Sequence, residues 1–137
     1  DRAWDDDTRS DLEAVLKELH REAVPRRFDP CLQSARAGTD RFAEHLREQR
    51  KKDPPPERSE LEELVARERE TFEHVLDTTL DRYLESLPRT LGSDSELQLR
   101  DELFDLEQAA ARLICDELVR EPLGAHFDEQ TSAALGD

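Results

Sequence analysis

The sequence KKDPPPERSE, residues 51–60, contains the strongest break in the chain. Its three consecutive prolines cannot continue a helix, because each lacks a backbone N–H donor and pushes the preceding residue toward extended backbone. The run is short, so we expect a stiff corner between two helices and no boundary between domains. Apolar residues recur with helical spacing on both sides, and the chain is therefore expected to reverse direction here.

The residues before this corner are expected to form two helices. Over residues 30–52 the apolar positions step by four and three without a break in phase, which favours one helix that includes Gly38. Gly38 should weaken that helix by about 1 kcal/mol relative to Ala. A stripe of Leu and Val predicts an earlier helix over residues 9–23, and Pro25 is expected to end it.

After the corner, the pattern predicts two more helices. Residues 57–87 carry apolar positions in an eleven-residue repeat, which is typical of a nearly straight helix. Residues 94–120 form the fourth expected helix, and Pro122 with Gly124 is expected to end it. Four helices joined by short loops predict an all-α fold: an antiparallel up-down-up-down four-helix bundle with a short C-terminal tail, in one domain over residues 1–137.

The composition is strongly acidic. The 137 residues carry a formal net charge of −15, and 40% of them are charged. This balance argues against nucleic acid or an anionic membrane as partner, because both attract clustered Lys and Arg. The chain has seventeen Arg and only three Lys, which indicates a GC-rich genome. Together with the acid excess, this bias is similar to that of proteins from salt-loving archaea. The acidic surface is therefore expected to reflect a high-salt or GC-rich source.

The chain shows no sign of a membrane span or of a disulfide framework. It contains no run of 18 apolar residues, so we expect a cytoplasmic protein. Cys31 and Cys115 lack the C-x-x-C spacing of redox and zinc sites, and both are expected to be free thiols.

The helix expected at residues 94–120 carries two apolar lines. One of them consists of Leu97, Phe104, Ala111 and Leu118. A helix that is apolar on two sides is either central in its bundle or in contact with a second chain. No catalytic motif or phosphate-binding glycine loop is present, so we expect no enzyme and no cofactor. The favoured function is a non-catalytic interaction or regulatory module, which contacts a protein partner or a second copy through this line.

The alternative is a metal-binding four-helix bundle. If the chain reverses at each expected corner, His20, Cys31, His74 and Asp105 share one layer, one residue from each helix. His20, His74 and Asp105 are then the candidate metal ligands. The Glu-x-x-His motif of di-iron bundles is missing from the sequence. A third hypothesis is an acidic mimic of nucleic acid, although the acids are spread over every helix and not aligned in rows.

Overall fold

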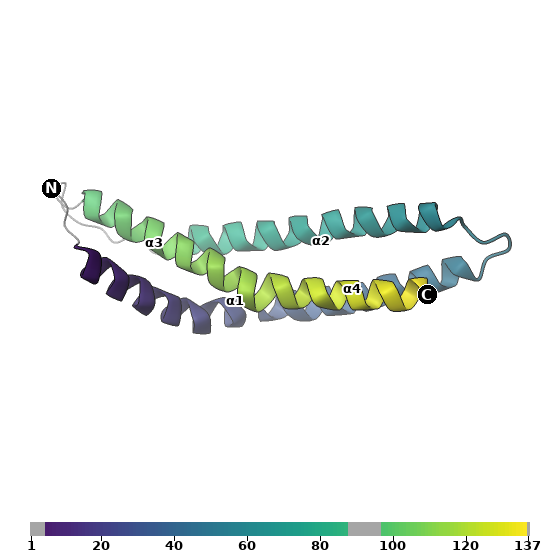
Figure 1. Cartoon of the computed structure of the whole chain (residues 1–137), viewed down its shortest axis with the longest axis horizontal. Coiled ribbons are helices and arrows are strands. Elements are labelled where there is room, and N and C mark those ends of the chain that lie inside the picture. Colours follow the sequence, from purple (N-terminus) through teal and green to yellow (C-terminus); the bar gives the residue numbers. More distant parts are fainter. Residues whose placement is uncertain (1–4, 88–96, 137) are drawn as a thin grey trace.

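The structure is a computed structural model that describes residues 5–87 and 97–136. These residues form helices and no strands, so the all-α class is confirmed. They make three long helical rods, which run side by side along an elongated molecule (Figure 1). The first rod is α1 (Asp6–Arg50), and the second is α2 (Arg58–Ser86). The third rod consists of α3 (Leu97–Cys115), the π-helical turn η2 (Asp116–Arg120) and α4 (Glu121–Leu135).

The four-helix topology is wrong, because the chain does not reverse near Pro25. Helix α1 continues through both Pro25 and Pro30. A proline inside a helix removes one backbone hydrogen bond and clashes with the carbonyl four residues earlier, which bends the helix. Figure 1 shows α1 bowed about halfway along its length, where these prolines lie. Val24 and Phe28 are completely buried at the bend, and this burial offsets the cost of the prolines.

The expected C-terminal tail is also wrong, because residues 121–135 are helical. Pro122 is the second residue of α4 and follows the π turn η2. In that turn the backbone N–H of Glu121 donates to the carbonyl of Asp116, five residues back. This wider turn accommodates the position where proline interrupts the ordinary ladder. The apolar spacing continues through Val119, Leu123 and Phe127, and Phe127 is only 1% exposed. Burial of that stripe keeps the segment helical.

The expected helix over residues 57–87 is confirmed as α2. The corner before it spans residues 51–57, as the prolines predict, and α2 runs antiparallel to α1 (Figure 1). The backbone N–H of Glu57 donates to the Glu60 carboxylate at 2.9 Å, which satisfies one of the free donors at the start of the helix. The connection between α2 and α3 lies outside the described residues.

The main core lies along the middle of the three rods. Phe127 of α4 stacks on Phe42 of α1 at a ring distance of 6.0 Å and meets Phe72 of α2 at 5.5 Å. Phe127 thus joins Phe42 and Phe72 in one aromatic cluster that contains a residue from each rod. Smaller clusters extend the core toward both ends: Ala43, Leu46, Leu61 and Ala134 near the corner, and Leu16, Leu106 and Ala110 at the opposite end.

An arginine network ties α2 to the third rod. The Arg120 guanidinium donates to Asp77 of α2 at 2.5 Å and to Asp116 at 3.0 Å, and it also pairs with Glu73 of α2. The hydrogen bonds and charges of these carboxylates raise the pKa of Arg120, against the effect of its partial burial. The third rod is therefore attached to α2 by polar contacts as well as by its apolar face.

Candidate functional site

The structure does not bring the candidate metal ligands together. His20 is buried, whereas His74 and Asp105 are exposed on their helices. His20 and Cys31 lie on the same continuous helix, eleven residues or about 16 Å apart, so the expected layer does not form. Among the described residues, no group of three or more His, Cys, Asp or Glu side chains is arranged to hold a metal ion.

His20 contacts Tyr83 instead. The His20 Nδ1 and the Tyr83 hydroxyl lie 2.8 Å apart, and the two rings meet edge to face. Burial lowers the pKa of His20 and raises the pKa of Tyr83. The second ring nitrogen of His20, Nε2, is buried without a hydrogen-bond partner in the described structure. This pair joins α1 to α2 inside the molecule and is closed to solvent.

Part of the proposed contact line of the fourth expected helix packs against the main core. Ala111 is fully buried in the main core, and Leu118 packs against that core from its edge. Phe104 is half-buried, and the side chain of Leu97 lies outside the described part of the structure. The second line, with Leu106 and Ala110, packs beside Leu16 of α1. The two apolar lines are therefore explained by the packing of the third rod against both α1 and α2.

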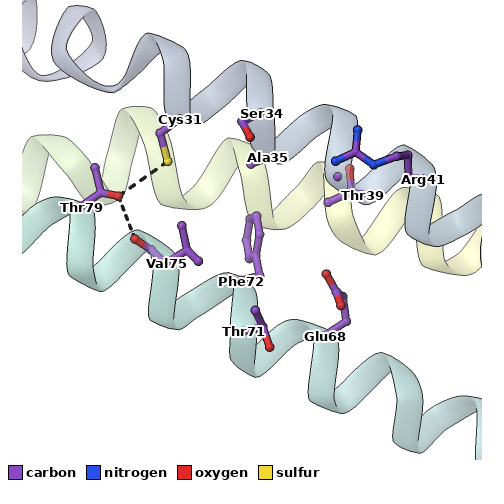
Figure 2. A pocket seen from close by; sticks show the side chains of 11 residues that line it. Cys31, Ser34, Ala35, Thr39, Arg41, Glu68, Thr71, Phe72, Val75 and Thr79 are labelled. Atoms are coloured by element: carbon purple, nitrogen blue, oxygen red, sulfur yellow. Dashed lines mark hydrogen bonds between the residues drawn. The ribbon is translucent and has the colours of Figure 1, made fainter.

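A groove runs between α1 and α2, with the third rod passing behind it (Figure 2). Its volume is about 430 Å³, within the range of pockets that bind ligands. Most of the side chains that line it are small or apolar. They are Cys31, Ser34, Ala35, Gly38, Thr39 and Arg41 from α1, and Glu68, Thr71, Phe72, Val75 and Thr79 from α2.

Gly38 is the unusual residue of this groove. A Cβ atom built at Gly38 would meet only the tip of the Arg41 side chain, at 4.0 Å. Glycine inside a helix costs about 1 kcal/mol relative to alanine, so it normally has a reason in packing or function. Within the described structure, no neighbouring atom requires this position to be glycine. Its absent side chain leaves room for an atom that approaches from outside the chain.

The threonine hydroxyl groups of the groove donate to carbonyls of their own helices. Thr79 donates to the backbone carbonyl of Val75 at 2.8 Å, and its oxygen lies 3.9 Å from the Cys31 sulfur. Thr39 donates to the carbonyl of Arg36 at 2.9 Å. Most of the surface that lines the groove is apolar. The lining therefore suits an apolar surface better than a small polar ligand.

Two charges and one apolar side chain remain available at the rim. Arg41 and Glu68 lie at the same end of the groove (Figure 2), and neither forms an ion pair with a described side chain. Val75 is 48% exposed although it is large and apolar. The groove thus combines an apolar floor, a small-residue wall and free charges, as helix-binding surfaces do.

This groove was not predicted from the sequence. Glu68 is half-buried at the rim of the groove. The available signal was the spacing of Cys31, Ser34, Ala35 and Gly38, small residues three and four positions apart on one helical face.

No protein-family model matches the chain, and comparisons with curated proteins and with solved structures gave no match. Among the described residues, no helix combines the length and the apolar composition needed to cross a bilayer.

Proposed function

We propose that this chain is a non-catalytic interaction module that receives a helix of a protein partner in the groove between α1 and α2. The observation that carries the proposal is Gly38, which weakens α1 and opens a wall that no described residue fills. A helix laid along the groove would cover Val75 and Phe72 and would pack closely against Ser34 and Gly38. Helix-in-groove recognition of this kind uses apolar anchors spaced along one helix face.

Two side chains that could carry chemistry, Cys115 and His20, are buried inside the molecule. Cys115 is buried in the main core, and burial raises the pKa of its thiol to about 11. His20 is closed off by its contact with Tyr83. These groups serve packing, and neither is presented at the groove. The proposed partner surface also differs from the line through Phe104 and Ala111, because Ala111 lies inside the core.

A photo-crosslinking residue placed in the groove tests this proposal. The cross-linker replaces Ser34, which lines the groove, and the matched control replaces Asp105, which is exposed on α3. We expect cross-linked protein from position 34 and none from position 105 in the cells that make this chain.

The variant Gly38→Leu tests whether the open groove is needed for the cross-link, because the leucine side chain would fill it. It should abolish the cross-link while circular dichroism shows an unchanged helical content, because a Cβ at position 38 meets only the tip of the Arg41 side chain. Equal products from both positions, or a cross-link that survives Gly38→Leu, would show that the groove is not the binding surface.

A further inference from the structure

We infer that the groove receives helix α2 of a second copy of this chain, in an antiparallel arrangement with its two-fold axis beside Val75. This inference rests on the proposed function and names the partner. In a two-fold dimer, every contact between two different positions occurs twice, so the contact surface must complement itself. The outer face of α2 meets this requirement in both charge and shape.

The first complementary pair is Glu68 and Arg82. Each lies seven positions from Val75, on opposite sides of it. The fourteen residues between them make about four helical turns, so both lie on the same face of α2. An antiparallel second copy centred at Val75 places its Arg82 opposite Glu68 and its Glu68 opposite Arg82. A parallel copy would instead place like charges together, which is unfavourable.

The second complementary pair is Arg67 and Glu85. Eighteen residues, or five helical turns, separate them, and their midpoint is position 76, next to Val75. The same antiparallel arrangement therefore brings Arg67 of each copy close to Glu85 of the other. None of these four side chains forms an ion pair within the described structure, so all four remain available.

The apolar contacts have the same symmetry. Val75 lies at the centre and is half exposed, and Thr71 and Thr79 flank it at four positions on either side. The antiparallel copy thus places Thr71 against Thr79, two short side chains that allow close approach. The Val75 side chain of each copy then enters the groove of the other, beside the wall where Gly38 and Ser34 leave room.

The net charge determines the salt concentration at which this dimer should be most stable. Each chain carries −15, so two copies repel one another over long distances. At about 1 M salt the screening length falls to roughly 3 Å, which removes the long-range repulsion. Charge pairs that the interface buries are screened much less, and the apolar burial remains. Self-association should therefore be stronger at about 1 M KCl than at about 0.15 M.

Sedimentation equilibrium of the full chain tests the dimer with charge-reversed variants. The wild type should show the mass of two chains in the higher salt. Glu68→Arg and Arg82→Glu should each weaken the dimer by about tenfold or more, because each creates two like-charge contacts. The double variant Glu68→Arg/Arg82→Glu restores opposite charges and the original net charge, and it should recover the dimer. Asp105→Arg, on the exposed surface of α3, makes the same charge change as Glu68→Arg and should stay dimeric.

The outcomes separate this inference from the proposed function. A wild-type mass of one chain at every concentration and salt would overturn the dimer, and so would Glu68→Arg that associates as well as Asp105→Arg. If position 34 then cross-links to a different protein, the interaction module stands with another partner. If position 34 cross-links to nothing, the interaction module fails as well. Circular dichroism of each variant confirms that a lost dimer is not a lost fold.

Discussion

The His20 imidazole and the Tyr83 hydroxyl form a hydrogen bond of 2.8 Å between α1 and α2, across 63 positions of sequence. His20 is 5% exposed and Tyr83 is 7% exposed, so water cannot replace either partner. Tyr83 also packs edge to face on Phe28, which connects this polar contact to the main core. The pair therefore fixes the register between the first two rods at the end away from the proline corner.

Tyr83→Phe should destabilise the protein by about 1–3 kcal/mol, because it leaves both ring nitrogens of His20 buried without a partner. Urea unfolding followed by circular dichroism measures the change. Ser86→Ala is the matched control, since that hydroxyl only donates to the nearby Tyr83 carbonyl on an exposed turn. A loss in Tyr83→Phe no larger than in Ser86→Ala would contradict a stabilising role for the pair.

The stability of the fold should depend on the protonation of His20. Burial lowers the pKa of His20 in the folded state, so below about pH 6.5 the unfolded chain binds more protons than the folded chain. The contribution of neutral His20 is complete above pH 6.5 and is lost as the pH falls toward the lowered value. His20→Phe removes this group, and the variant should lose less free energy of unfolding than the wild type over that range. Parallel pH profiles for the two proteins would refute the assignment.

The sequence predicted which segments are helical better than it predicted where each helix begins and ends. The periodicity of α2 and of residues 30–50 was correct, because a buried stripe requires that spacing. Pro25 and Pro122 were treated as terminators, but proline raises the cost of a helix without forbidding it. Val24 and Phe28 are buried around Pro25, and η2 accommodates Pro122. Rules that consider only neighbouring residues in the sequence cannot include the stabilisation from these tertiary contacts.

The candidate site was harder to predict than the fold, because it depends on which helices are neighbours. The metal layer assumed a reversal between His20 and Cys31, and the continuous α1 removes that layer. The groove depends on the side of α1 and α2 that the third rod leaves open, which no pattern within either helix reveals. Only the small residues around Gly38 gave a local signal of it.

Arg120→Gln should destabilise the protein by about 1–3 kcal/mol, because Asp77 and Glu73 of α2 lose a charged partner that is three-quarters buried. Arg47→Gln breaks a more exposed pair with Glu44 and should cost less than about 0.5 kcal/mol. Urea unfolding of both variants measures the difference. Equal effects would mean that the Arg120 network contributes no more than an ordinary surface pair.

Gly38→Ala should stabilise the isolated chain by about 1 kcal/mol, because the new methyl group meets only the end of Arg41. Gly136→Ala should instead destabilise it, because Gly136 has a φ of +62° and a Cβ there would lie 2.6 Å from the Arg50 guanidinium. Thermal unfolding at low protein concentration shows whether each variant is more or less stable than the wild type. A destabilised Gly38→Ala variant would show that α1 needs this glycine for its own fold, and the groove would lose its main support.

Thiol labelling distinguishes the two cysteines and reports on the groove. Cys115 is fully buried with a pKa raised to about 11, whereas Cys31 lines the groove and is partly exposed. A thiolate-specific reagent should therefore modify one thiol per native chain and two per chain in denaturant. Serine at position 31 should abolish the native reaction, and two reactive thiols in the native protein would contradict the burial of Cys115. Because a second copy would cover Cys31, the native reaction should be faster in Glu68→Arg than in Asp105→Arg under the salt conditions that favour the dimer.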